Sequence, residues 1–171
     1  MKQPGSVLIF LASSGFSSTE YRTARASLIG QGFRTFVFAS APGFCRGDDG
    51  LVVKPDVLIE NVKPSNFNAL LLIGGQGVKN HFRDDALLRL ISGFNNAGKF
   101  LAAICAAPVL LVSAGVLSEG EAACHPSYKQ ELINGKIDYS DKAFVIQGRI
   151  LTGKDAPSSP VFMNALISML K

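Results

Sequence analysis

The sequence predicts an α/β fold in which a doubly wound, mostly parallel β-sheet is sandwiched by helices. Several short apolar runs lack the polar alternation of a half-exposed strand, which is typical of parallel strands buried on both faces. Segments with helical periodicity and capping residues separate these runs, and that alternation favours a parallel sheet. The chain has 171 residues, 47% hydrophobic and 18% charged, which is enough for one domain spanning residues 1–171.

The first predicted elements follow from apolar runs and from the glycine, proline and capping residues that bound them. Residues 6–12 form a continuous apolar run and predict the first buried strand. Residues 20–29 predict a helix that a serine or threonine caps and that two glycines end. Residues 34–40 predict the second strand. Residues 41–50, rich in Gly and Pro, predict a loop in which Cys45 is a loop residue or interface filler.

The middle of the chain leads to a strand that ends in a cysteine. Residues 51–53 and 57–59 predict short strand pieces on an excursion from the main sheet. Residues 69–73 predict a buried strand that ends in glycines, and residues 84–98 predict a helix capped by aspartate. Residues 100–104 predict the next buried strand. The remaining expected elements are a helix from Pro108, a short strand at 121–126, a short helix at 128–133, a hairpin of 143–146 and 150–153, and a terminal helix capped by Ser158 or Ser159.

Composition argues against several classes of protein. The formal net charge is +4, but the basic residues are scattered singly, which argues against nucleic-acid binding. No apolar run approaches the ~18 residues of a membrane span. The three cysteines form no disulfide framework and suit a reducing compartment, so we expect a cytoplasmic protein. Because phosphate-loop and dinucleotide patterns and zinc-like Cys/His spacing are all missing, we expect no cofactor and no metal.

Cys105 stands where the 100–104 strand gives way to a helix. Ala106 and Ala107 are small enough for a tight turn, and Pro108 suits a first helical turn because it loses no hydrogen bond there. The N-terminus of that helix would favour a thiolate at Cys105, and its N–H groups could hold an oxyanion. The alternative is a small buried hydrophobic residue, and the local sequence leaves both interpretations open.

Three further positions follow predicted strands. Glu20 lies in a first helical turn, where it could simply complement the helix dipole, but its place after the first strand favours the ligand crevice. Gly74 and Gly75 form a second candidate oxyanion loop, because backbone can approach a ligand closely there. His125 has a backbone restrained by the proline that follows it, although a lone histidine is more often structural. We expect His81 on the surface.

These positions predict one reactive site. In a doubly wound sheet the carboxyl ends of the strands converge on one crevice, so Glu20, the Gly74–Gly75 pair, Cys105 and His125 should meet there. A cysteine, a glutamate and backbone donors together can attack an electrophilic carbon, stabilise the oxyanion and move a proton.

The segment Ala102–Pro108 resembles the nucleophile elbow of the ThiJ/PfpI superfamily, which has a class I glutamine amidotransferase-like fold, in the branch of the parkinsonism-associated deglycase. Glu20 matches the family glutamate that hydrogen-bonds the cysteine, Gly74–Gly75 matches the oxyanion loop, and His125–Pro126 matches the histidine-proline pair near the cysteine. The similarity extends over nearly the whole chain. It implies a flavodoxin-like sandwich, usually a homodimer, that acts without a cofactor in oxidative or carbonyl stress.

The resemblance also implies an activity. Such proteins are associated with glyoxalase III-type conversion of methylglyoxal to lactate, protein deglycation, chaperoning and redox sensing. We expect a cysteine enzyme for small reactive carbonyls in which Cys105 adds to the aldehyde, Glu20 moves the proton, His125 assists, and the backbone at Gly74–Gly75 and Ala106 binds the substrate oxygen. The alternatives are a non-enzymatic redox sensor or chaperone that uses an oxidised Cys105, and a PfpI-type cysteine peptidase or other amide hydrolase.

The chain departs from the family pattern at three places. Ala106 stands where the peptidase branch has a histidine, which disfavours the peptidase alternative. Ile73 replaces a proline before the glycine pair, and Lys154–Pro157 replaces an arginine-glycine-proline-glycine loop that bears on the substrate and the dimer contacts. We expect a homodimer also because Phe16 and Phe44 lie outside the obvious sheet core.

Overall fold

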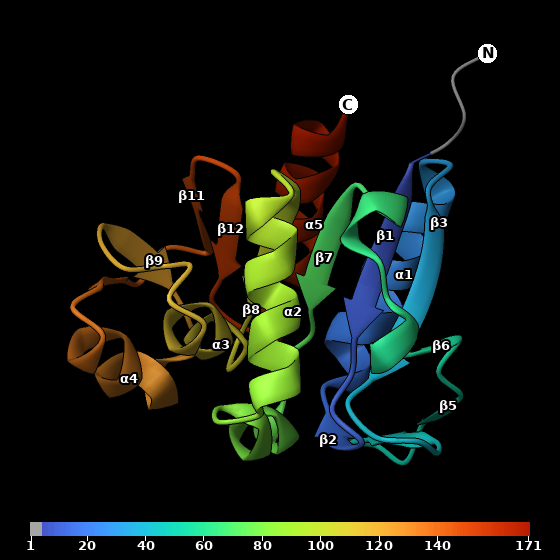
Figure 1. Cartoon of the computed structure of the whole chain (residues 1–171). Helices are drawn as coiled ribbons and strands as arrows, with labels where there is room; N and C mark the ends of the chain where they lie inside the picture. Colours follow the sequence, from blue (N-terminus) through green and yellow to red (C-terminus); the bar gives the residue numbers. More distant parts are fainter. Residues whose placement is uncertain (1–4) are drawn as a thin grey trace.

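The computed structural model describes residues 5–171 and shows a central β-sheet between two layers of helices (Figure 1). In spatial order the described strands of this sheet are β11 (Phe144–Gln147), β12 (Ile150–Gly153), β8 (Phe100–Ile104), β7 (Ala69–Leu72), β1 (Ser6–Phe10), β3 (Arg34–Ala39) and β6 (Val57–Leu58). All neighbouring strands pair in parallel except the antiparallel hairpin of β11 and β12. The predicted α/β fold with a doubly wound, mostly parallel sheet is confirmed.

The helices cover the sheet on both faces. The described α-helices are α1 (Ser18–Gly30), α2 (Asp85–Asn96), α3 (Pro108–Ser113), α4 (Lys129–Asn134) and α5 (Ser159–Leu170). Helices α1 and α5 pack against each other behind the sheet in Figure 1, whereas α2 and α3 lie in front of it. Side chains cap two of them, since Ser17 Oγ accepts from the backbone N–H of Glu20 and Asp84 Oδ1 accepts from that of Leu87. Among residues 5–171, no helix has both the length and the hydropathy needed to cross a bilayer.

The apolar runs occupy the centre of the sheet because both of its faces are covered. Every residue of β1 and β7 is buried. The ring of Phe10 packs against that of Phe38 on the neighbouring strand β3, with the centroids 5.5 Å apart. Each such side chain contributes roughly 1.5–3 kcal/mol when it is fully removed from water. These segments lack polar alternation because neither face of the strand is exposed to solvent.

The strand order reverses between β1 and β7. Helix α1 carries the chain from β1 to β3 on one side, whereas β7 pairs with the other side of β1. Ligands of open α/β sheets bind at such a switch point, outside the carboxyl ends of the strands. Glu20 follows β1 and Gly74 follows β7, so the fold brings these two residues to the same edge of the sheet.

Small sheets and single turns border that edge. Strands β2 (Ser14–Phe16), β4 (Cys45–Gly47) and β5 (Val52–Val53) form one small sheet, and β9 (Glu121–Ala123) pairs with β10 (Asp138–Ser140) in another. Short 3-10 segments lie at Ile59–Asn61, Pro64–Asn66, Gln76–His81, Pro126–Tyr128 and Ala156–Ser158. Strands β2, β4 and β10 are too short to leave a periodic signal, which is why the sequence did not predict them.

Three expectations for the first half of the chain were wrong. Residues 57–58 form β6, which pairs with β3 at the edge of the main sheet, so this piece is not on an excursion. Cys45 lies in β4 and is completely buried. Phe16 is also completely buried and meets the ring of Tyr21 edge-on at 5.8 Å, whereas Phe44 is 63% exposed as expected. Long-range packing of the small sheet accounts for both buried residues.

Two further expectations concerned polar side chains. His81 is partly buried rather than a surface residue, because its ring contacts the edge of Phe10 and its Nδ1 lies 3.0 Å from Asp84 Oδ2. Ser158 precedes α5, but its side chain does not cap that helix. Instead, Asp155 Oδ1 accepts hydrogen bonds from the backbone and the hydroxyl of Ser158.

Candidate active site

Cys105 occupies a strained turn at the carboxyl end of β8. Its φ is +65°, in the left-handed region that non-glycine residues rarely adopt. Two hydrogen bonds hold it there: its N–H donates to Gly153 O at 3.0 Å, and its carbonyl accepts from the N–H of His125 at 2.9 Å. A backbone held in this way costs of order 1–3 kcal/mol and is typical of functional turns. The turn presents the side chain at the top of the sheet, as in a nucleophile elbow.

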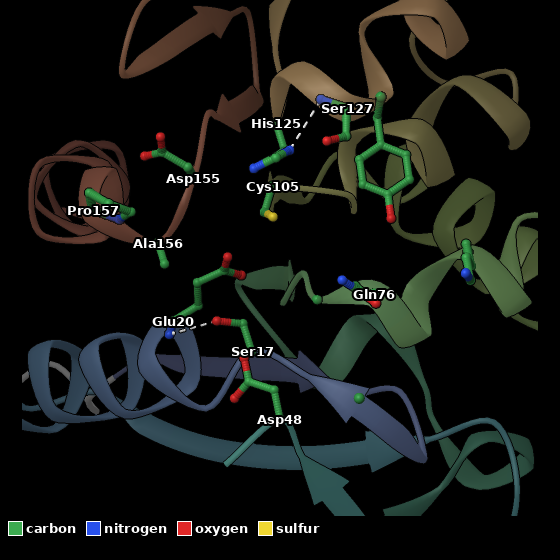
Figure 2. Close-up of a pocket in the computed structure, with 14 residues that line it drawn as sticks. Ser17, Glu20, Asp48, Gln76, Cys105, His125, Ser127, Asp155, Ala156 and Pro157 are labelled. Atoms are coloured by element: carbon green, nitrogen blue, oxygen red, sulfur yellow. Dashed lines mark hydrogen bonds between the residues drawn. The ribbon is translucent and has the colours of Figure 1, made fainter.

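A cavity of about 880 Å³ opens above this turn (Figure 2). Glu20, Gly75, Cys105 and His125 all line it, so the fold brings together residues that the sequence placed after four different strands. Gly74 and Ala106 are next in sequence to lining residues but do not line the cavity themselves. Cys105 is the partly exposed cysteine, whereas Cys45 and Cys124 are completely buried.

Glu20 is a buried carboxyl directed at the cysteine. Its side chain is only 1% exposed, and Figure 2 shows the carboxyl pointing toward Cys105. Oε2 accepts a 2.8 Å hydrogen bond from the N–H of Gly74, and Oε1 has no hydrogen-bond partner among residues 5–171. Burial raises the pKa of Glu20 to about 7, although the hydrogen bonds from Gly74 and Cys105 act in the opposite direction. Glu20 can therefore both accept and return a proton near neutral pH.

The cysteine itself does not rest as the thiolate that a helix N-terminus would favour. Burial and, after it, repulsion by the carboxylate of Glu20 raise the pKa of the Cys105 thiol to about 12. Helix α3 begins only at Pro108, too far along the chain for its dipole to outweigh these two effects. Because the two groups titrate as a pair, a negative charge on one keeps the proton on the other. A reaction at this thiol would therefore need a base, and Glu20 is the carboxyl that faces it.

The backbone donors around the sulfur come from two loops. The N–H groups of Gly75 and Ala106 act on the Cys105 sulfur and lower the pKa of the thiol. The N–H of Gly74 is already used by Glu20, so Gly74 positions the carboxyl instead of facing a substrate oxygen. Gly75 has a φ of +112°, and a Cβ there would lie 2.5 Å from the nitrogen of Ser17. Only glycine fits this position.

His125 lies beside Cys105 with a defined ring orientation. Its Nδ1 accepts a 3.1 Å hydrogen bond from the N–H of Ser127, drawn as a dashed line in Figure 2. That contact assigns the proton of the neutral ring to Nε2. The ring of Tyr128 packs edge-on against His125, with centroids 6.4 Å apart. His125 can thus donate a hydrogen bond through Nε2, but its Nδ1 is not available as a base.

Sequence reasoning missed several residues that line the cavity. They are Asp48, Gln76, Lys79, Ser127, Tyr128 and Asp155. Asp155 belongs to the loop that departs from the family pattern, which was the one signal available. The others come from turns whose direction only the packed structure determines. Residues 5–171 contain no group of three or more His, Cys, Asp and Glu placed to hold a metal ion.

Comparison with known proteins agrees with this geometry. Residues 5–169 match the DJ-1/PfpI family. The chain is 26% identical over 164 residues to the deglycase PH1704 of Pyrococcus horikoshii, across 96% of this chain and 99% of that protein. It is 25% identical over 166 residues to the glutathione-independent glyoxalase DJR-1.2 of Caenorhabditis elegans, across 97% of this chain and 89% of that protein. A crystal structure of a ThiJ/PfpI domain protein from Brachyspira murdochii has the same fold, with a TM-score of 0.94 at 24% identity over 99% of this chain and 98% of that one. The chain therefore belongs to the DJ-1/PfpI family.

Proposed function

We propose that this protein is a cysteine-dependent enzyme that converts small reactive carbonyl compounds without a cofactor, with methylglyoxal as a substrate and lactate as its product. The observation that carries the proposal is the pair formed by Cys105 and Glu20, each of which changes the pKa of the other inside a cavity. Relatives named deglycase and glyoxalase support a reaction of this class. A reducing compartment such as the cytoplasm suits the free cysteines.

In the first step the Cys105 sulfur adds to the aldehyde carbon. Glu20 takes the thiol proton as the carbon–sulfur bond forms, and the carbonyl electron pair moves onto the oxygen. The N–H groups of Gly75 and Ala106 stabilise that oxyanion, because they already point at the reacting sulfur. Glu20 then returns the proton to the oxygen, which gives a hemithioacetal and restores the carboxylate.

In the second step hydrogen moves between the two adjacent carbons of the substrate. The Glu20 carboxylate removes the hydrogen of the former aldehyde carbon as a proton and delivers it to the neighbouring carbon. The hydroxyl proton of the hemithioacetal passes to the former ketone oxygen, to which Nε2 of His125 donates a hydrogen bond. The product is a 2-hydroxy thioester of Cys105. Water hydrolyses its carbon–sulfur bond to give lactate and the free thiol. The net reaction adds one water to methylglyoxal and needs no external oxidant or reductant.

The test is the formation of lactate from methylglyoxal by the purified protein, without glutathione and in the presence of a chelator. We expect one lactate for each methylglyoxal consumed. The matched control is Cys45→Ala, which removes a buried sulfur outside the cavity and should leave the rate near that of the unmodified protein. Absence of lactate would overturn the proposal. Negligible turnover of every dicarbonyl, together with a discrete oxidised mass on Cys105, would favour the redox-sensor alternative.

A further inference from the structure

We propose that Asp48 and Asp155 make the Cys105 cavity select carbonyl compounds that are neutral or positively charged and reject those that carry a carboxylate, such as 2-oxo acids. The inference rests on the proposed function for the kind of substrate. Its test measures the chemistry of the thiol instead of turnover, so the two proposals can fail separately.

The two aspartates line the cavity from separate loops. Asp48 follows β4 and Asp155 follows β12, and both line the cavity together with Cys105. In the view of Figure 2, Cys105 and the carboxyl of Glu20 lie between them, with Asp48 beside Ser17 and Asp155 on the far side. A substrate bound to the sulfur is therefore within the field of two carboxylates from separate loops.

Neither aspartate forms an ion pair within residues 5–171. Asp48 Oδ1 accepts from the N–H of Ser18 at 3.1 Å, and Asp155 Oδ1 accepts from the N–H of Ser158 at 3.0 Å. These donors are neutral. Within residues 5–171, the ion pairs closest to them in sequence lead elsewhere, from Arg22 to Asp49 and from Lys154 to Asp141. Arg22 and Lys154 thus pair with other carboxylates, although the charge of Asp155 also acts on Lys154.

The charge of both aspartates reaches the carboxyl that faces Cys105. Asp48 and Asp155 each raise the pKa of Glu20, in addition to the larger effect of its burial. Glu20 also has a buried oxygen, Oε1, without a partner among the described residues, so the cavity holds an unused polar atom for a ligand. Lys79 is the single lysine or arginine among the described lining residues. The lining of the cavity therefore carries more acidic than basic side chains.

The size of the effect follows from Coulomb's law. Two unit charges about 4 Å apart interact by about 1 kcal/mol in water, and by more in a partly enclosed cavity. Salt screens such charges over about 10 Å at 0.1 M, so pairs within one cavity remain coupled. Asp48 and Asp155 repel a carboxylate on the substrate, whereas they attract an ammonium group on a carbonyl compound.

The experiment compares the rates at which Cys105 reacts with three methanethiosulfonates that differ in charge. These are the cationic 2-aminoethyl, the neutral methyl and the anionic 2-sulfonatoethyl reagents. In each reaction the cysteine sulfur attacks the thiosulfonate sulfur, a disulfide forms, and methanesulfinate leaves. Peptide mass mapping assigns the product to Cys105. The ratio of the cationic to the anionic rate cancels any change in the thiol pKa, and 2-mercaptoethanol supplies the intrinsic ratio.

We expect the ratio for the protein to exceed that for 2-mercaptoethanol by about tenfold at low salt. Asp48→Asn and Asp155→Asn should each lower it about threefold, and the double variant should bring it close to that of the free thiol. Asparagine keeps the oxygen that accepts from Ser18 or Ser158, so these variants retain the local hydrogen bonds. Glu60→Gln, at an exposed acid that does not line the cavity, is the matched control and should leave the ratio unchanged.

A ratio equal to that of 2-mercaptoethanol, or one that neither asparagine variant alters, would overturn the inference. A high ratio in a protein that forms no lactate would remove only the proposed function. If the protein forms lactate but its cationic-to-anionic rate ratio equals that of 2-mercaptoethanol, only the inference of charge selection is overturned.

Discussion

The backbone N–H of Gly74 donates a 2.8 Å hydrogen bond to Oε2 of Glu20, and this contact fixes the carboxyl that faces Cys105. Gly74 follows β7 and Glu20 lies in the first turn of α1, so the bond joins the two sides of the switch point. The packing around Gly74 is equally tight. A Cβ added there would lie 2.6 Å from Cys105 Cβ and 2.9 Å from Glu20 Oε2.

Gly74→Ala should therefore displace both reacting groups at once. We expect loss of lactate formation and a decrease of about 1–3 kcal/mol in the free energy of unfolding, because the added methyl meets backbone and buried side chains. Urea unfolding and the lactate assay measure the two effects. Gly30→Ala, at the end of α1 with open space around its Cβ, is the control and should leave both unchanged or slightly raise stability. An active Gly74→Ala protein would contradict the assigned geometry.

Three substitutions should separate the roles of the site residues. Cys105→Ser should abolish lactate formation, because the nucleophile is lost. Glu20→Gln keeps an oxygen for the N–H of Gly74 but has no basic carboxylate, so it should slow thiol addition and stop the proton transfer between carbons. His125→Ala should be the mildest, about tenfold, because it removes one hydrogen-bond donor. Steady-state rates of lactate formation decide the order, and full activity of Cys105→Ser would refute the mechanism.

Cys105 should react with iodoacetamide and peroxide well ahead of the other cysteines. It is partly exposed in the cavity, whereas Cys45 and Cys124 are completely buried, and burial raises their thiol pKa values to about 11 and about 12. The basis is access and the base Glu20, since the pKa of the Cys105 thiol is also raised. Peptide mass mapping over a time course measures the order. Earlier labelling of either buried cysteine would count against the cavity.

The stability of the protein should depend on pH through Glu20. Its pKa is about 7 in the folded protein, against an ordinary value of 4.5. Between these pH values the folded protein holds a proton that the unfolded chain has released, so this contribution is complete below pH 4.5 and is lost as the pH rises through 7. We expect a fall of about 3 kcal/mol in the free energy of unfolding across this window. Glu20→Gln should lack that fall, and equal pH dependence of the two proteins would contradict the raised pKa.

The protein should form a homodimer at micromolar concentration. The expectation rests on the family resemblance and on the exposed ring of Phe44, which a partner subunit could cover. Phe16 no longer supports it, because that ring is buried within the chain. Light scattering measures the mass directly. A clean monomer would remove the idea.

The sequence by itself determined the central strands of the sheet and the residue at the turn after β8. Apolar runs indicate strands that are covered on both faces, and residues 105–108 indicate a tight turn into a helix. Both patterns depend only on local backbone preference and on burial, which the sequence shows directly. The parallel order then required Glu20 and the glycine pair to meet Cys105 at one edge. Those inferences need no distance between side chains.

The tertiary structure alone decided the electrostatics of the site. The raised pKa values of Glu20 and Cys105 come from burial and from each other, and these groups lie far apart in the chain. The local pattern had favoured a thiolate, since it showed a helix start but not the carboxyl opposite it. Asp48 and Asp155 likewise face the site only because two loops turn toward it. Charge interactions depend on distances through space and on the removal of water. The residues next to a group along the chain determine neither of them.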